Sequence, residues 1–327
     1  MNLEALTDNI TNPALLFFIL GIIAVQVKSD LKIPENSSKF ISIYLLLSIG
    51  FKGGQELSHS GLSSEILWSI VVGVLLASAI PVASFFILKR KLSIENAGAI
   101  AASYGSVSAV TFVTTISFLD IEHVSFSGHM IAVMAVMEAP AIIVGVLLIN
   151  KYKAASDPDG TAKPKHSKRK MVKHSITNGS VFLILGSLLI GFLASPEQAA
   201  GIRPFTTDIF KGFLAVFLLD MGITSGRHLS IMFRNGLYPF MFSTIMPFVN
   251  GLIALFISMQ ITDVVGNQLL FAILGASASY IAVPAAMKNS VPEANPSLYL
   301  PMALGITFPI NVMIGIPFYY SLILFMH

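Results

Sequence analysis

Two apolar stretches rich in glycine and serine, Gly98–Thr111 (GAIAASYGSVSAVT) and Ala272–Ala286 (AILGASASYIAVPAA), decide the fold of this chain. An offset of 174 residues sets Ala102-Ser103 of the first stretch against Ala276-Ser277 of the second. Both stretches are apolar enough for a bilayer, yet their glycines and hydroxyls loosen a helix. Paired segments of this kind, at matching positions in two halves of a membrane protein, are typical of the binding site at the repeat interface of a transporter.

The composition places most of the chain in a membrane. Hydrophobic residues make up 54% of the 327 residues and charged residues only 11%, far from the averages of soluble proteins. Ten stretches come near the roughly 20 apolar residues that cross a bilayer. They are approximately residues 13–28, 40–57, 66–88, 94–117, 128–150, 176–194, 205–227, 237–260, 266–287 and 297–325. The sequence therefore predicts an all-α polytopic membrane protein with ten transmembrane helices in two sets of five.

The distribution of Lys and Arg predicts the orientation, because positive charge next to a span stays on the cytoplasmic side. The segment 151–174 contains eight Lys and Arg residues and two acidic ones, Asp157 and Asp159. If ten spans alternate around this segment, Arg203 is the only Lys or Arg in an outer loop. We therefore expect a multi-pass protein of the plasma (cytoplasmic, or cell inner) membrane, with both termini outside.

Two further alignments indicate an internal repeat. Residues Gly50–Leu57 align with Gly222–Leu229 at an offset of 172, and Pro140 aligns with Pro309 at an offset of 169. Each repeat holds an odd number of spans, so the second copy enters the membrane from the opposite side. The repeat therefore predicts a pseudo-two-fold axis in the membrane plane.

The expected organisation is a first five-span repeat over residues 1–150, a basic cytoplasmic linker over 151–174, and a second, inverted five-span repeat over 175–327. Within the linker, Ala154–Lys168 (AASDPDGTAKPKHSK) combines Pro, Gly, Ser and both signs of charge. This composition is typical of a flexible connector. The alternative interpretation is a solvated segment that binds no partner.

The candidate binding residues lie in the fourth and ninth spans, which we expect to be broken or polar. A broken helix is tolerated in hydrocarbon only where it faces protein or a wet cavity, so such a break marks a possible binding site. Half-helix N-termini present N–H donors and a positive dipole end to an anion, whereas hydroxyls and freed carbonyls suit Na⁺. The candidate substrate- and ion-binding residues are Ser103, Gly105, Ser106, Ser108, Thr111, Ser277, Ser279, Tyr280 and Pro284. The alternative is that these small residues only permit close helix packing.

Ionisable residues inside the predicted spans form a second group of candidates, because a charge in the bilayer is costly and usually marks a pathway or an ion pair. Asp220 lies in the middle of an apolar run (FLAVFLLDMGI), and Glu138 precedes Pro140 in the fifth span. Lys52 and Glu56 are one helical turn apart and can pair with each other. Asp220, Glu138 and Lys52 are therefore candidate cation or proton sites. A structural hydrogen bond for either Asp220 or Glu138, or snorkelling of Lys52, is the alternative.

A further set of motifs extends from about Ile33 to the C-terminus, with the linker excepted. The motifs are Ile33-Pro34-Glu35, Gly50-Phe-Lys-Gly-Gly54, Gly105-Ser-Val-Ser108 with Thr111, Met137-Glu-Ala-Pro-Ala141, Phe210-Lys-Gly212 with Met221-Gly222 and, most specifically, Ala276-Ser-Ala-Ser279 followed by Val291-Pro-Glu-Ala-Asn-Pro-Ser297. In these motifs the chain resembles the cyanobacterial-type sodium-dependent bicarbonate transporters. The resemblance implies a mobile core domain and a gate domain, an elevator-like movement, a homotrimer, and a bicarbonate and Na⁺ site between the fourth and ninth spans. It also implies, for some members, a PII-like regulatory protein that blocks transport from the cytoplasm.

The chain resembles a divergent member, because it departs from that pattern at the site. The family's ninth span has a carboxylate followed by Ile-Ser-Gly-Pro, whereas this chain has Tyr280-Ile-Ala-Val-Pro284. The fourth-span Ser-Gly-Ser-Thr of the family becomes Ser108-Ala-Val-Thr111. Asp220 falls where the family pattern is apolar, so it is a candidate for a relocated carboxylate. We expect a weaker Na⁺ dependence than is usual in the family, an altered substrate, or both.

The sequence thus predicts a secondary active transporter that imports bicarbonate or a similar small anion with Na⁺, or with H⁺, by elevator-type alternating access. Two alternatives stay open: a small organic-acid or solute permease of the same fold, and a transport-inactive membrane receptor or regulatory protein. An enzyme is not expected, because the sequence has no HExxH motif and no paired membrane aspartates, and the missing P-loop argues against a primary pump. Beyond the lipid bilayer and Na⁺ as coupling ion, we expect neither a cofactor nor a nucleic-acid partner.

Overall fold

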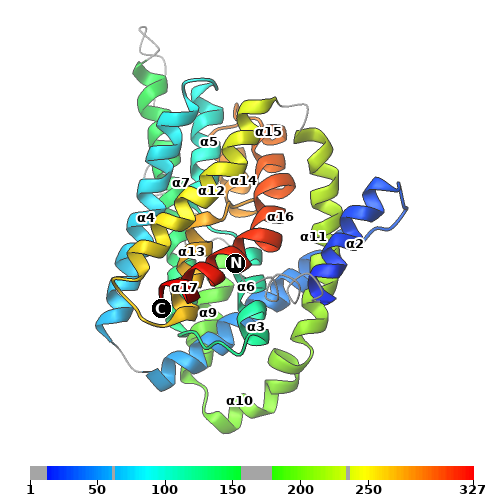
Figure 1. The fold of residues 1–327 in the computed structure, drawn as a ribbon, viewed down its shortest axis with the longest axis vertical. Helices are drawn as coiled ribbons and strands as arrows, with labels where there is room; N and C mark the ends of the chain where they lie inside the picture. Colours follow the sequence, from blue (N-terminus) through cyan, green and yellow to red (C-terminus); the bar gives the residue numbers. More distant parts are fainter. Residues whose placement is uncertain (1–12, 61–62, 156–178, 233–235) are drawn as a thin grey trace.

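A computed structural model describes residues 13–60, 63–155, 179–232 and 236–327 (Figure 1). These residues form helices and loops and contain no β-strand. The all-α class expected from the sequence is therefore confirmed. The N-terminal residues 1–12, and most of the predicted linker 151–174, lie outside the described residues.

The helices follow the ten predicted apolar stretches closely. In the first half they are α2 (Pro13–Gln26), α3 (Glu35–Ser60), α4 (Ser64–Leu88), α5 (Ile94–Gly105), α6 (Ala109–Ile121) and α7 (His129–Ala155). In the second half they are α9 (Gly179–Leu193), α10 (Pro196–Arg203), the π-helical η1 (Pro204–Asp208), α11 (Phe210–Met232), α12 (Leu237–Ser258), α13 (Val265–Ala276) and α14 (Ala282–Ser290). The last stretch comprises α15 (Pro296–Pro301), η2 (Met302–Thr307), α16 (Phe308–Ile310), η3 (Asn311–Gly315) and α17 (Ile316–Met326).

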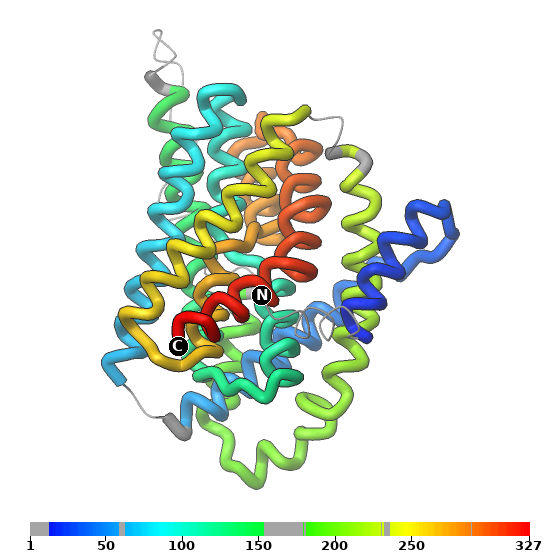
Figure 2. Tube along the Cα trace, viewed as in Figure 1, coloured from blue at the N-terminus to red at the C-terminus, as the bar shows by residue number. Residues whose placement is uncertain are grey.

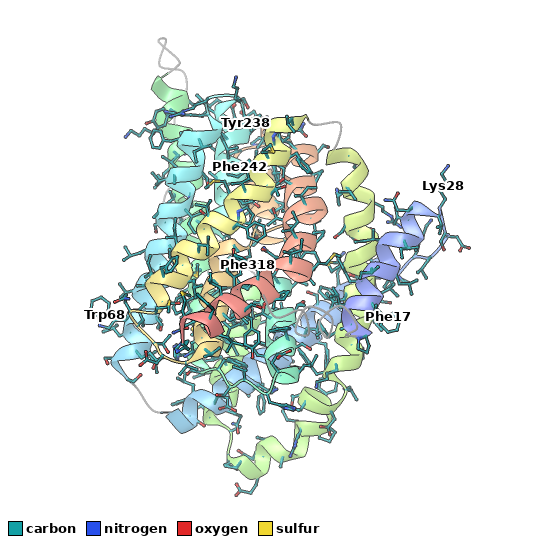
Figure 3. The ribbon with its side chains drawn as sticks, in the orientation of Figure 1. Phe17, Lys28, Trp68, Tyr238, Phe242 and Phe318 are labelled. Carbon is teal, nitrogen blue, oxygen red and sulfur yellow. The ribbon has the colours of Figure 1, made fainter. Side chains whose placement is uncertain are left out.

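Six helical units among the described residues are long and apolar enough to cross a membrane. They are Ser64–Leu88, Ile94–Ile121, His129–Lys153, Pro196–Leu229, Leu237–Ser258 and Pro296–Met326. Three apolar helices are shorter: Pro13–Gln26, Val181–Leu193 and Val265–Ala276. Large apolar side chains such as Phe17 and Trp68 point outward on opposite flanks of the molecule, as a lipid-facing surface requires (Figure 3). Ten crossings stay a prediction.

Close glycine contacts hold two pairs of helices together: α2 packs along α11, and α3 packs along α9. The two pairs meet where α3 contacts α11. A Cβ atom on Gly222 of α11 would clash with the main chain of Phe18, and the Cα of Gly21 is a neighbour of the same position. The same arrangement recurs between α3 and α9, where a Cβ atom on Gly191 would clash with the main chain of Phe51. These contacts bring helix backbones together as small residues do in membranes. We call α2, α3, α9 and α11 the crossed-pair group.

The remaining long helices form a second group, in which α4, α5 and α7 pack against one another and α13 packs against α12 and α17. A buried polar chain connects the two halves of the sequence in this group. The hydroxyls of Tyr104 in α5 and Thr307 in η2 are 2.7 Å apart, and Thr307 donates to the carbonyl of Ser243 in α12 at 2.8 Å. At one end, Lys153 of α7 pairs with Glu95 at 3.2 Å and with Glu293 at 3.1 Å. We call these helices, together with α6 and α14, the main bundle.

Candidate functional site

The helix of the fourth predicted span is interrupted at Ser106–Ser108, between α5 and α6. Ser108 caps the N-terminus of α6, since its Oγ accepts from the N–H of Thr111 at 3.2 Å and from the Thr111 hydroxyl at 2.9 Å. The Oγ of Ser106 is buried and has no hydrogen-bond partner among the described residues. The expected break is therefore present. It leaves a buried hydroxyl unsatisfied in the middle of the protein.

The helix of the ninth predicted span is interrupted between α13 and α14, and its break lies against the first one, near the centre of the molecule (Figure 2). The N–H of Ser279 donates to the carbonyl of Ser103 at 2.8 Å, and the Ser103 hydroxyl donates to the carbonyl of Ser279 at 2.6 Å. The N–H of Ser108 donates to the Oγ of Ser277 at 3.0 Å. The carbonyl of Ala276 accepts from the side-chain amide of Asn311 at 2.7 Å. The two segments thus satisfy each other's main-chain groups, as a broken helix in a membrane requires.

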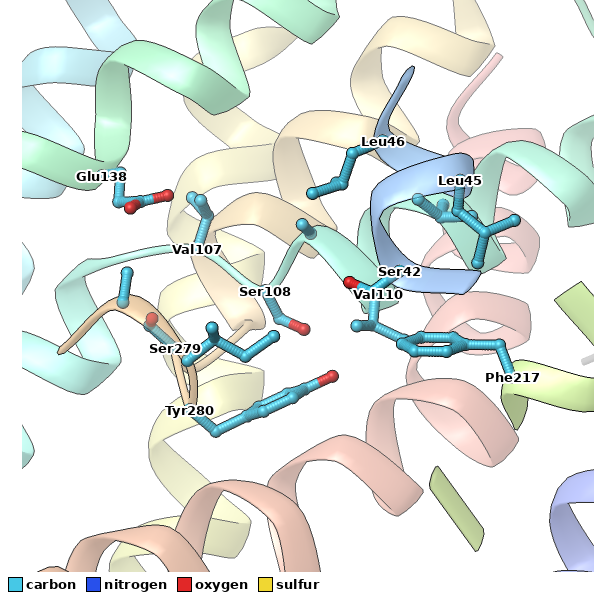
Figure 4. A pocket seen from close by; sticks show the side chains of 14 residues that line it. Ser42, Leu45, Leu46, Val107, Ser108, Val110, Glu138, Phe217, Ser279 and Tyr280 are labelled. Carbon is cyan, nitrogen blue, oxygen red and sulfur yellow. The ribbon is translucent and has the colours of Figure 1, made fainter. Parts of the chain in front are cut away.

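A small cavity of about 30 Å³ borders the two breaks. In Figure 4 the hydroxyls of Ser108, Tyr280 and Ser42 point toward one another, and Phe217 lies opposite Glu138. The cavity is lined by Ser42, Leu45, Leu46, Val107, Ser108, Ala109, Val110, Val113, Glu138, Phe217, Ser279, Tyr280, Ile281 and Ala282. Residues from α3 and α11 form one wall, and residues from the breaks, α6, α7 and α14 form the other. The candidate site therefore lies between the crossed-pair group and the main bundle.

The predicted site residues fall into two sets. Ser108, Ser279, Tyr280 and Glu138 line the cavity. The others lie around it: Ser103 and Ser277 join the two breaks, Thr111 supports Ser108, Gly105 packs against Pro81, Ser106 is buried in the break, and Pro284 lies in the first turn of α14. The structure thus brings the two segments together, and binding by these residues stays a prediction.

Two ionisable candidates lie outside the cavity lining. Asp220 accepts a hydrogen bond of 2.5 Å from the hydroxyl of Ser38, between α11 and α3. Lys52 lies near the far end of α3, where its Nζ is 3.8 Å from an Oδ atom of Asp120. The ion pair of Lys52 with Glu56 that the one-turn spacing permits is not among the ion pairs of the described residues. The end of α6 offers Lys52 a different carboxylate, which the spacing along α3 cannot reveal.

Glu138 is the carboxylate that reaches the cavity. The residue is 8% exposed, and its Oε1 has no hydrogen-bond partner among the described residues. Pro140, two residues after Glu138 in α7, has no N–H to donate to the carbonyl of Val136. A buried carboxylate without a protein partner is costly, which favours an ion or a proton as its partner.

The sequence interpretation missed the wall of the cavity that comes from α3 and α11. Ser42 and Phe217 line the cavity, but neither lies in Gly98–Thr111 or Ala272–Ala286, the two stretches from which the site was predicted. One signal was available: Ser38 and Ser42 are four residues apart in α3 and therefore share a face.

The walls of the cavity offer groups that suit an anion and a cation on different sides. The first residues of α6 and α14, Ala109 and Ala282, both line it, so the positive ends of two helix dipoles border the space. Its lining includes no Lys, Arg or His. An anion would therefore be held by N–H groups and hydroxyls, and Glu138 would favour a cation.

An all-helical, multi-pass protein whose cavity lies at two interrupted helices falls, by its architecture, in the class of membrane transport proteins. The chain belongs to the Na⁺-dependent bicarbonate transporter superfamily, because the model of this family matches residues 13–324. This membership makes the protein a permease rather than an enzyme. No curated protein matches the sequence.

Proposed function

We propose that this permease is a secondary active transporter that imports bicarbonate, or a small anion like it, together with Na⁺. The observation that carries the proposal is the cavity bordered by the N-termini of α6 and α14 and by Ser108 and Ser279. Such a site holds a small anion through hydrogen bonds without a cationic side chain. The substrate class follows from the family, in which the chain is placed over residues 13–324.

The coupling to a cation follows from electrostatics. Moving one elementary charge against the membrane potential costs about 2.3 kcal/mol per 100 mV, so import of a monovalent anion into a negative-inside cell needs a cotransported cation. Hydroxyls and carbonyls at the breaks suit Na⁺, and Glu138 supplies a negative charge at the same cavity. A proton on Glu138 is the second candidate for the coupling ion.

The packing of the helices supports an elevator-type mechanism with inverted repeats. The pairs α2 with α11 and α3 with α9 are related by exchange of the two halves, as a pseudo-two-fold axis requires. The candidate site lies where this crossed-pair group, the proposed gate domain, meets the main bundle, the proposed core domain. A sliding movement of the bundle along the pairs would carry the site across the membrane. The predicted homotrimer and PII-like cytoplasmic regulator belong to the same proposal.

Uptake of labelled bicarbonate into proteoliposomes, with and without an inward Na⁺ gradient, tests the proposal. We expect uptake that rises with the Na⁺ gradient and is not reproduced by a K⁺ gradient. A pH gradient that replaces the Na⁺ gradient in full would instead assign H⁺ as the coupling ion. Absence of bicarbonate uptake, with uptake of small organic acids, would favour the organic-acid permease, and absence of both would favour the receptor.

A further inference from the structure

A second cavity, of about 270 Å³, lies beside the far end of α3. It is lined by Phe51, Lys52, Gln55, Glu56, Pro196, Ala199, Ala200, Arg203, Thr206 and Thr207. Lys52 and Arg203 contribute two positive charges and Glu56 one negative charge, while Gln55, Thr206 and Thr207 contribute uncharged polar groups. These lining residues suit a small inorganic anion. The cavity at the two breaks differs in this respect, because no cationic side chain lines it.

Arg203 is an exception to the rule that Lys and Arg next to a span stay on the cytoplasmic side. It is the one Lys or Arg that the proposed topology puts in an outer loop, and it belongs to α10, which lies at the opposite end of the molecule from the end of α7 (Figure 1). Among the ion pairs that the described residues form, none includes Arg203. An unpaired positive charge at the outer surface requires a reason other than retention in the cytoplasm.

Lys52 differs from Arg203 because it already has a partner. Asp120, at the end of α6 in the main bundle, lies 3.8 Å from Lys52 in the crossed-pair group. The other ion pairs of the described residues join positions within one group: Glu35 with Lys39 in α3, and Lys153 with Glu95 and Glu293 in the main bundle. The pair of Lys52 with Asp120 thus bridges the two groups, which these other pairs do not. With Asp120 in place, the charges around the cavity nearly cancel.

The two cavities follow each other along one face of α3. Leu45 lines the first cavity and Lys52 the second, and residues seven apart lie on nearly the same side of a helix. The rise between them is about 10 Å along the axis. An anion held at Lys52 is therefore two helical turns from the candidate site.

We propose that Lys52 and Arg203 form an anion-collecting site at the outer end of α3, and that Asp120 is a mobile counter-ion that occupies Lys52 until the main bundle moves. The site deepens the proposed function, on whose anion transport and outward orientation it rests. When α6 carries Asp120 away, Lys52 is released and the cavity becomes positive, so that it attracts the anion when the pathway from outside opens. When Asp120 returns, it displaces the anion from Lys52.

The charge of this cavity can be measured without transport, because the chain has no cysteine. A single cysteine at Ala200, an exposed residue of the cavity lining, is modified from outside by anionic and by cationic methanethiosulfonate reagents of similar size. The readout is the ratio of the anionic to the cationic rate. Replacing both positive residues, Lys52→Gln and Arg203→Gln, should lower the ratio about fivefold at 0.1 M salt, and the difference should vanish at 1 M salt. Asp120→Asn should raise the ratio, the opposite sign.

Lys39→Gln is the matched control, because Lys39 lies on the same helix outside the second cavity, where it pairs with Glu35. This variant should leave the ratio unchanged. A ratio that does not respond to the double substitution, or modification of Ala200→Cys from the cytoplasmic side alone, would overturn the proposal. A second readout is the KM for bicarbonate, which should rise about fivefold in the double variant with kcat nearly constant. If the modification ratios behave as expected while the wild type transports no bicarbonate, the anion-collecting site stands and the proposed function fails.

Discussion

Ser103 and Ser279, which are 176 residues apart in the sequence, are joined by two hydrogen bonds. The Ser103 hydroxyl donates to the carbonyl of Ser279 at 2.6 Å, and the N–H of Ser279 donates to the carbonyl of Ser103 at 2.8 Å. Both residues are almost fully buried. Main-chain groups that the breaks free from their helices are therefore satisfied across the two halves, which fixes the geometry of the candidate site.

Ser103→Ala should destabilise the protein. The substitution removes the donor for the buried carbonyl of Ser279, and an unsatisfied buried acceptor costs about 1–3 kcal/mol. The measurement is the melting temperature of the purified protein in detergent, which should fall. Ser84→Ala is the matched control: the Ser84 hydroxyl is fully buried but has no hydrogen-bond partner, so its removal should be neutral or stabilising. Equal losses for the two variants would contradict this account of Ser103.

The sequence predicted the helices and the two breaks well, because they follow from composition along the chain. Apolar stretches of span length and the runs around Ser106 and Ser279 are local signals, and the structure places helices and interruptions there. The offset of 174 residues paired Ser103 with Ser277, whereas the hydrogen bonds pair Ser103 with Ser279 and Ser108 with Ser277. The repeat offset thus identifies equivalent positions in the two halves, but equivalent residues are not the ones that contact each other. Which residues contact each other across the two breaks depends on how the helices pack.

Contacts between distant helices were the part that the sequence could not predict. The spacing of Lys52 permits a pair with Glu56, one turn away, but Lys52 lies near Asp120, 68 positions along the chain. Asp220 was a candidate for the site because it interrupts an apolar run, yet its partner is Ser38 of α3. In both cases the sequence shows the spacing of residues along one helix, but it does not show which face of a neighbouring helix packs against them.

Gly222→Ala should weaken the packing of α2 against α11. A Cβ atom at this position would meet the main chain of Phe18, which cannot move aside as a flexible side chain can. We expect a lower melting temperature and less folded protein in the membrane. Gly186→Ala, in α9, is the matched control, since a Cβ atom there has no neighbour within 4 Å. That variant should be neutral or gain up to about 1 kcal/mol from helix propensity. A stable Gly222→Ala protein would show that the two helices separate easily.

Glu138→Gln should weaken the response of transport to Na⁺. The substitution keeps the shape of the side chain but removes the one carboxylate among the cavity-lining residues, and an interaction with a charged group contributes about 1.5–3 kcal/mol. The Na⁺ concentration for half-maximal uptake of bicarbonate should therefore rise about tenfold or more. Size-exclusion chromatography checks that the variant is folded.

Asp220→Asn is the control for Glu138, because Asp220 is a carboxylate of the proposed gate domain that does not line the cavity. Its uptake rate and its Na⁺ and pH dependence should stay close to those of the wild type, which would make Asp220 a structural residue. A larger change for Asp220→Asn than for Glu138→Gln would move the cation site to the contact between α3 and α11.

Tyr280→Asp should strengthen the Na⁺ dependence, because it returns a carboxylate to the position where the resembled family has one. The phenol of Tyr280 is 3.9 Å from the sulfur of Met221 and lines the cavity, so a shorter carboxylate has room there. A carboxylate is the better ligand for a hard cation, and the Na⁺ concentration for half-maximal uptake should fall about tenfold. Tyr280→Phe, which keeps the ring and loses only the hydroxyl, should change this concentration less than about threefold. If the wild type already binds Na⁺ as tightly as Tyr280→Asp does, uncharged oxygens and Glu138 suffice, and the missing carboxylate has no effect on coupling.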